Sequence, residues 1–330
     1  MKYFVRVGAM LVLALLLLTG CNKNEAPTES EPITYTVQFN THGGSAVPSQ
    51  TVKEGGKVAT PEDPIRENYI FAGWKNGAKE WSFTYDNVNA DLSLEAAWIS
   101  ADNVFEYQAI EGGDCAYITA LKCEYKTLLV PTSINGFRVV GLGDGVFADL
   151  LSDTVQKIIV PEGVTEVGEE AFANVKGISV VFEGEASAIG ERAFLNCDGL
   201  TAIRLSEGME RIPTEAFMGS GLKTLITPST VAVVEESAFQ NCAALQTIVL
   251  YGTMAQNEAA FVIEDSAFRE CTALKTVFLY GDSADGEALI RKSDRQNKSL
   301  TDAAFYYYSE TEPTGAGRYW YMHDGKPRVW

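Results

Sequence analysis

The chain has 330 residues, enough for two domains of ordinary size. Its 46% hydrophobic and 21% charged residues are typical of a folded protein and argue against intrinsic disorder. The formal net charge of −18 argues against binding to nucleic acid, whose phosphates require clusters of Lys and Arg, and against resting on an anionic membrane surface.

Residues 1–20 have the pattern of an export signal. Lys2 and Arg6 precede an apolar run, 7–18, which is shorter than the roughly 20 residues that span a bilayer. The run ends in Leu18-Thr19-Gly20-Cys21, which resembles the lipobox of bacterial lipoproteins. This resemblance implies cleavage before Cys21, a diacylglycerol on its sulfur, and an exported protein that is lipid-anchored to the membrane and exposed on the cell surface. The alternative is an ordinary signal peptide with an accidental cysteine.

Residues 21–33 are predicted to be a flexible tether, because they are rich in Asn, Glu, Pro, Thr and Ser and cannot bury a core. Short alternating strands broken by glycine and proline then fill residues 34–99. Their order, including Gly43-Gly44, Tyr69-Ile-Phe-Ala-Gly-Trp74 and a final Trp98, resembles the internalin B-repeat. The resemblance implies a small β-grasp-like domain of bacterial cell surfaces. This copy departs from the family pattern by inserting Trp81 into a loop that is more usually short and polar.

Internal repeats dominate residues 102–330. Phenylalanines recur at intervals of 22 to 29 residues, and in five of the six repeats alanine precedes the Phe directly and Val or Ile lies five residues before it. Because one such unit cannot bury its own apolar side chains, the units must stack, one turn of a coil per repeat, around a continuous core. The six phenylalanines are Phe147, Phe172, Phe194, Phe217, Phe239 and Phe268.

The period and the recurring Leu-x-x-Ile-x-Leu segments resemble the BspA-like leucine-rich repeats of bacterial surface antigens, over Phe105 to Trp330. The predicted fold class is therefore β-rich: a right-handed leucine-rich repeat solenoid preceded by a small β-grasp-like domain. We expect atypical terminal units at 105–142 and 304–330, because open ends of a solenoid would expose its core. Polar insertions are predicted at 252–258 and 282–299.

The cysteines follow the repeat. Cys197, Cys242 and Cys271 each lie three residues after a repeat Phe, which predicts a small buried hydrophobic side chain at that position. Cys242 and Cys271 fall in adjacent turns, near enough for a disulfide. Cys115 and Cys123 flank a predicted strand and form a second candidate pair. The sequence leaves both bridges open.

No combination of residues indicates catalysis. His42 and His323 stand in turns without a nucleophile beside them, and Gly141 to Gly145 fits a repeat turn better than a phosphate loop. We therefore expect a protein that is not an enzyme and that has no metal site and no cofactor.

A partner would bind the outward side of the predicted strands. Five of the six outward residues are apolar, which indicates either a binding surface or mere packing between rungs. Three functions follow: an adhesin that binds a host or bacterial surface protein, a glycan- or cell-wall-binding protein that uses aromatics such as Tyr251, Tyr280, Tyr319 or Trp320, or a structural spacer. The six outward residues are Ile159, Phe182, Arg204, Ile226, Val249 and Phe278.

Overall fold

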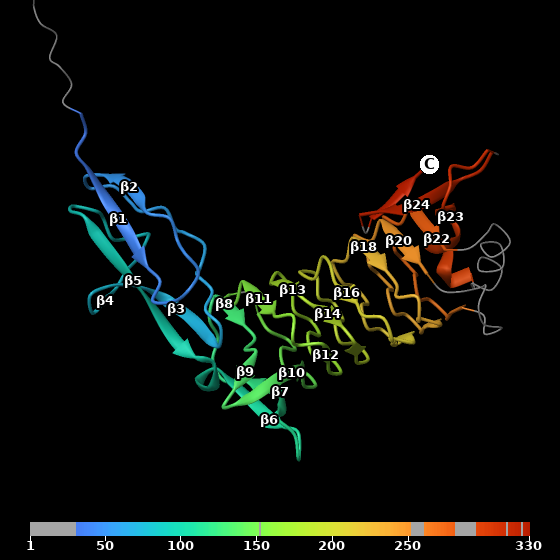
Figure 1. Cartoon of the computed structure of the whole chain (residues 1–330), viewed down its shortest axis with the longest axis horizontal. Helices are drawn as coiled ribbons and strands as arrows, with labels where there is room; N and C mark the ends of the chain where they lie inside the picture. The colour runs from blue at the N-terminus through green and yellow to red at the C-terminus, as the bar shows by residue number, and fades with distance from the viewer. Residues whose placement is uncertain (1–30, 152, 252–260, 281–294, 315, 325) are drawn as a thin grey trace, which may run out of the picture.

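The computed structural model describes residues 31–151, 153–251, 261–280, 295–314, 316–324 and 326–330. Figure 1 shows an elongated molecule in which a small sheet (blue to cyan) stands at one end of a row of stacked turns (green to red). The fold is β-rich, as the sequence predicts. The helical segments among the described residues are η1 (Ala101–Asn103), η2 (Arg295–Asn297) and α2 (Lys298–Thr301).

The N-terminal sheet has five strands in the spatial order β2-β1-β5-β3-β4, and only β1 and β5 run parallel. Alternate side chains along these strands, among them Val37, Trp74 and Leu94, pack into one small core. The β-grasp-like classification and the boundaries 34–99 remain predictions. The strands are β1 (Thr34–Asn40), β2 (Gln50–Lys53), β3 (Tyr69–Asn76), β4 (Lys79–Glu80) and β5 (Leu92–Ser100).

The terminal parts of the repeat region are more irregular than its centre. At the start, β6 and β7 form an antiparallel pair, and β7 runs parallel to β10 (Phe137–Leu142). At the end, β23 continues the sheet of the repeats, β24 follows it, and β25 turns back antiparallel. These strands are β6 (Phe105–Ala109), β7 (Cys115–Leu121), β9 (Ser133–Ile134), β23 (Ala304–Tyr308), β24 (Tyr319–His323) and β25 (Lys326–Val329).

The turns between these ends contribute strands to two parallel ladders, and each ladder is divided into two sheets, because among the described residues no strand pairing joins β13 to β18 or β15 to β17. The first ladder consists of leucine strands: β8 (Thr127–Leu129), β11 (Lys157–Val160), β13 (Ser179–Phe182), β18 (Thr224–Ile226), β20 (Thr247–Leu250) and β22 (Thr276–Leu279). The second consists of branched strands: β10 (Phe137–Leu142), β12 (Glu166–Val167), β15 (Ala188–Ile189), β17 (Arg211–Ile212), β19 (Val233–Val234) and β21 (Val262–Ile263). Between the two sets of leucine strands, β14 (Glu185–Ala186) pairs with β16 (Arg204–Leu205).

The repeat phenylalanines form a continuous stack through the core. Their ring centroids lie 5.1–5.3 Å apart, and from Phe172 onward successive rings are within 11° of parallel. This spacing is close to the roughly 4.8 Å between neighbouring strands. The backbone N–H of Phe194 donates to the carbonyl of Ala216 in the next turn at 2.8 Å, and the same bond recurs along the stack. Backbone hydrogen bonds therefore join successive turns at the Ala-Phe pair.

Each of these turns also bends the chain through two left-handed residues, two positions before and two positions after the Phe. Their φ values lie between 53° and 69°. Asn tolerates this conformation better than most residues, and it occupies the second position at Asn174, Asn196 and Asn241. The amides also form a short ladder, since Asn196 Nδ2 donates to Asn174 Oδ1 at 2.9 Å.

Both ends of the stack are closed. At the last turn, Asn297 takes the place of a further repeat: its Oδ1 accepts the N–H of Phe268 at 2.8 Å, and its Nδ2 donates to the carbonyl of Glu264. At the first, Ile70 of the N-terminal sheet is buried in the same core as Phe105. The N-terminal sheet therefore packs directly against the solenoid rather than hanging from a linker.

Candidate functional site

The leucine strands at the C-terminal end carry a row of large side chains that point away from the core. Ile226, Val249, Phe278 and Tyr306 pair in register across β18, β20, β22 and β23. Their strand neighbours, such as Ile248, point into the core, so this row lies on the opposite side of the sheet. We call this side of β18, β20, β22 and β23 the outer face.

Two residues of the outer face that the sequence predicted to be exposed are buried. A side chain from a later part of the sequence covers them. Val249 is fully buried and Phe278 is 7% exposed. The indole of Trp320 lies 5.4 Å from the ring of Phe278, and its Nε1 donates to the carbonyl of Leu279 at 3.0 Å. Trp320 thus reaches back from β24 and seals this part of the row.

Two further outward predictions are wrong nearer the N-terminal end. Ile159 is only 2% exposed and pairs in register with Leu129 and Val181, so apolar neighbours flank it on both sides. Phe182 pairs with Val160, not with Ile159, and packs on the core rings of Phe172 and Phe194. The strand β13 is therefore shifted by one residue from the repeat frame that the sequence suggested.

Arg204 and Ile226 are exposed, as predicted, but they do not belong to one continuous surface row. Arg204 lies in the separate β14–β16 pair, and its guanidinium donates to the carbonyl of Glu183 at 2.6 Å. Ile226 keeps 38% of its surface exposed and marks the open edge of the outer face. The predicted binding column is thus reduced to the part of the outer face around Ile226.

Beside that row the structure brings three tyrosines together. The rings of Tyr251 and Tyr280 lie 5.3 Å apart, and those of Tyr280 and Tyr308 lie 4.1 Å apart and stack. The ring centroid of each of the three lies within 6.4 Å of the ring centroid of Trp320. Tyr280 keeps 38% of its surface exposed. The sequence had singled out Tyr251, Tyr280 and Trp320 without showing that they meet. It missed Tyr308, for which the alternation in Ala304–Tyr308 was the available signal.

Two tyrosines of this row are held in their protonated form. Burial raises the pKa of Tyr251, and burial together with a hydrogen bond with Tyr280 raises the pKa of Tyr308. These two phenols therefore stay protonated and can both donate and accept hydrogen bonds. Together with Tyr280 and Ile226 they form an uncharged aromatic surface on a strongly acidic chain.

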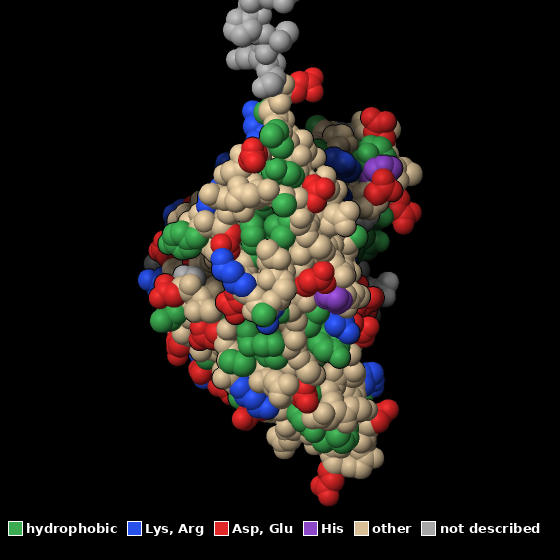
Figure 2. All heavy atoms as spheres, turned by 90° about the vertical axis from the view of Figure 1, so that its left-hand side faces the viewer, with side chains coloured by type: hydrophobic (Ala, Val, Ile, Leu, Met, Phe, Trp, Pro, Cys, Tyr) green, Lys and Arg blue, Asp and Glu red, His purple; other side chains and the backbone are tan. Residues whose placement is uncertain are grey.

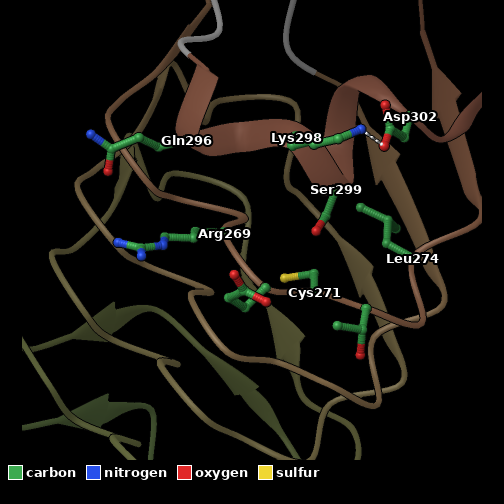
Figure 3. A pocket seen from close by; sticks show the side chains of 9 residues that line it. Arg269, Cys271, Leu274, Gln296, Lys298, Ser299 and Asp302 are labelled. Atoms are coloured by element: carbon green, nitrogen blue, oxygen red, sulfur yellow. Dashed lines mark hydrogen bonds and ion pairs between the residues drawn. The ribbon is translucent and has the colours of Figure 1, made fainter.

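A hollow of about 720 Å³ lies beside the last turn, and polar side chains line part of it (Figure 3). Cys271 lines it, but its thiol donates to the carbonyl of Phe239 at 3.1 Å, and burial raises its pKa, so it is a poor nucleophile. Lys298 forms an ion pair with Asp302. Elsewhere His42 pairs with Glu95, and within the described residues no His, Cys, Asp and Glu side chains group to hold a metal ion.

All five cysteines of the described chain are free, so neither candidate disulfide is formed in this structure. Cys242 donates to the carbonyl of Phe217 and Cys271 to that of Phe239, which directs each thiol to the backbone of the preceding turn. Cys115 opens the seven-residue strand β7, and Cys123 follows it. An extended strand of that length spans roughly 23 Å, far beyond the reach of a disulfide.

The predicted lipid-attachment residue, Cys21, lies outside the described residues. In the part of the chain that is described, no helix combines the length and the apolar character that a membrane crossing requires.

Comparison with known families agrees with both repeat patterns. Residues 127–246 match the BspA type leucine rich repeat region in six copies, and residues 35–97 match the Listeria-Bacteroides repeat domain. With the stacked parallel ladders, the first match shows that the fold is a leucine-rich repeat solenoid. The second supports the resemblance stated for the N-terminal sheet.

Two proteins of Evansella cellulosilytica whose names describe membrane proteins are similar to parts of the chain. One, described as Gly-rich, is 29% identical over 98 residues, which is 29% of this chain and 11% of that protein. The other is 28% identical over 140 residues, 38% of this chain and 21% of the relative. The chain thus spans only a small part of the length of these relatives.

Solved structures of leucine-rich repeat proteins are also similar. A leucine rich repeat protein of T. pallidum is 19% identical, with a TM-score of 0.45, and the match covers 61% of this chain and 97% of that one. A leucine rich cell surface protein of Faecalibacterium prausnitzii is 19% identical, with a TM-score of 0.33, over 54% of this chain and 69% of its own.

Proposed function

We propose that this protein is exported, anchored by lipid at Cys21 to the bacterial cell surface, and binds another protein through the outer face. The observation that carries the proposal is the uncharged row of Tyr251, Tyr280 and Tyr308 beside the exposed Ile226. Tyrosines are enriched at protein interfaces, where their rings supply large contact area with little conformational entropy to lose. The leucine-rich repeat fold supports a binding role, because its stacked strands hold such a surface rigid.

The anchor has its own test. Replacing Cys21→Ser removes the sulfur that would carry the lipid, so the chain should no longer incorporate a radiolabelled fatty acid and should lose its membrane association. Equal labelling of both forms would contradict the anchor and leave the binding proposal standing.

The binding proposal is tested with Ile226→Asp combined with Tyr280→Ala, measured on arrays of purified bacterial and host surface proteins. The first substitution places a charge in the interface with the partner, and the second removes an aromatic contact. Together they should weaken the affinity for a bound protein by roughly tenfold or more. Val262→Asp is the matched control, because Val262 is 41% exposed on the branched strand β21, in the other ladder. Equal loss in the control, or no saturable protein binding at all, would contradict the proposal.

Glycan binding is a second candidate, favoured by the stacked Tyr280 and Tyr308 rings, which offer a platform for a sugar ring. A glycan array distinguishes it: saturable binding that Tyr280→Ala removes would replace the protein partner by a glycan. Binding of neither class would leave the role of a structural spacer.

A further inference from the structure

A second hollow, of about 310 Å³, lies where the N-terminal sheet meets the start of the solenoid. Its walls come from both units and include five aromatic side chains: Phe71, Trp74, Trp81 and Phe83 from the N-terminal side, and Tyr125 from the solenoid. Binding pockets occur preferentially at such junctions between packed units.

The walls of this junction pocket are held in place by local contacts. The backbone N–H of Trp81 donates to the carbonyl of Trp74 at 2.8 Å. Asp86 accepts the N–H of Ser82 at 2.9 Å and pairs with Lys79, which closes the loop that presents Trp81. Trp81 is also one of the two residues, with Ala97, by which this chain departs from the family pattern that its N-terminal repeat resembles.

The opposite rim is held across the junction by Asp63. Its two carboxylate oxygens are used by Lys126 Nζ at 3.3 Å and Thr127 Oγ1 at 2.9 Å. The acid is therefore occupied in joining the two units.

One polar group in this wall lacks a partner. The indole Nε1 of Trp81 is buried and makes no hydrogen bond within the described chain, whereas the indoles of Trp98, Trp320 and Trp330 each donate to a carbonyl. A buried donor left unpaired is destabilising, because it has lost its hydrogen bond to water and gained none in return. A small turn of the ring toward the pocket would let an acceptor inside it take this N–H and remove that destabilisation.

These features define the chemistry of a ligand that would fit the pocket. It needs flat apolar surface for the rings and one acceptor for the indole, and few further donors, because Asp63 is already paired. A sugar, with many hydroxyl groups, would leave most of them unpaired. An X-Pro segment fits: the proline ring packs between aromatic rings, the proline nitrogen has no hydrogen to satisfy, and the carbonyl before it accepts a hydrogen bond.

We propose that the junction pocket binds an extended, proline-containing segment of a partner protein with basic flanking residues. A neighbouring hollow that shares Pro61 and Asp63 is lined by Val47, Pro48 and Ile65 and would take the next residues of an extended chain. Basic flanks follow from the net charge of −18 and from Glu62 in that second hollow. Figure 2, which views the end of the molecule formed by the N-terminal sheet, shows both acidic and basic side chains among the hydrophobic ones there.

The test uses the full chain in detergent and a fluorescein-labelled oligoproline peptide with an arginine at each end. The matched probe has glycine and serine in place of the prolines. Trp81→Phe keeps a ring but removes the N–H and should weaken binding roughly 2- to 10-fold. Trp81→Ala should weaken it further. Tyr85→Ala is the control on the same loop, because Tyr85 is 83% exposed and does not line the pocket.

A second readout is independent of the variants. In ¹⁵N-tryptophan-labelled protein, the oligoproline peptide should shift the indole signal of Trp81 and leave that of the distant Trp330 unchanged. Absence of saturable binding, equal binding of the glycine-serine peptide, or equal affinity of both Trp81 variants and the wild type would overturn the assignment. So would saturable binding of a chitin oligosaccharide at Trp81 instead. The result is separate from the outer face, since the variants of each site leave the other intact.

Discussion

At the scale of single residues, the buried thiols show how the repeat sets the chemistry of a side chain. Cys197 and Cys242 occupy the same place in their turns and are fully buried against the phenylalanine stack. Burial raises the pKa of Cys197 to about 12 and that of Cys242 to about 11, from an ordinary value of 9.0. The apolar core disfavours the charged thiolate, so the thiol stays neutral in the folded protein.

This predicts a loss of stability in alkali. Between about pH 9 and 11 the Cys242 thiol ionises in the unfolded chain but stays protonated in the folded one. The folded state then holds more protons, so the free energy of unfolding falls as pH rises, by about 1–3 kcal/mol for this group. In urea unfolding across this pH range, the free energy of unfolding should fall less steeply with pH in Cys242→Ala than in the wild type. The half-buried Cys115→Ala is the control, and identical slopes in all three proteins would contradict the prediction.

At the scale of secondary-structure elements, β24 determines which residues of the outer face remain exposed. Trp320 is fully buried and covers Val249 and Phe278, and its N–H is bonded to the strand beneath it. A parallel sheet whose outer side is covered in this way can carry apolar residues on both sides of its strands.

Trp320→Ala should therefore destabilise the protein by about 3–5 kcal/mol, because it removes a large buried ring and uncovers the row beneath it. Chemical denaturation measures the loss, and increased binding of a hydrophobic dye in the absence of denaturant would report the uncovered residues. Trp330→Ala is the matched control, since Trp330 is 43% exposed. A loss as small as that of the control would mean that Trp320 is not the cover.

At the scale of the whole molecule, Asn68 joins the two units. Its Oδ1 accepts the backbone N–H groups of Thr132 at 3.0 Å and Ser133 at 3.1 Å, and its Nδ2 donates to Ser133 Oγ at 3.0 Å. With Ile70 inside the solenoid core, this junction fixes the position of the N-terminal sheet. The pocket at Trp81 lies between the same two units.

Asn68→Ala should uncouple the two units. Two backbone donors lose their acceptor, at about 1–3 kcal/mol each, so calorimetry should show separate transitions or an earlier unfolding of the N-terminal sheet. Asn135→Ala is the control, because Asn135 has the same left-handed conformation and lies outside the junction. A melting profile no different from that of the control would show that Asn68 does not couple the units.

The repeat frame predicted the core of the solenoid with few errors. Val234, Ala238 and Phe239 are all buried where the pattern places them. The prediction failed where one turn departs from its neighbours: Phe182 points inward because β13 is shifted by one residue. A shift of one position in a strand exchanges its two sides, and a single irregular turn has no repeat to reveal the shift.

By itself the sequence determined that turns stack, which side chains fill their core and where the regular repeats give way to terminal units. These follow from periodicity, because every turn must bury the same positions against its neighbours. Only the tertiary structure decided which outward residues remain exposed, that Tyr251, Tyr280 and Tyr308 form one row, and that Asn68 and Trp81 stand at a junction. Those facts depend on contacts between segments far apart in the chain, such as Trp320 over Phe278, for which no local pattern exists.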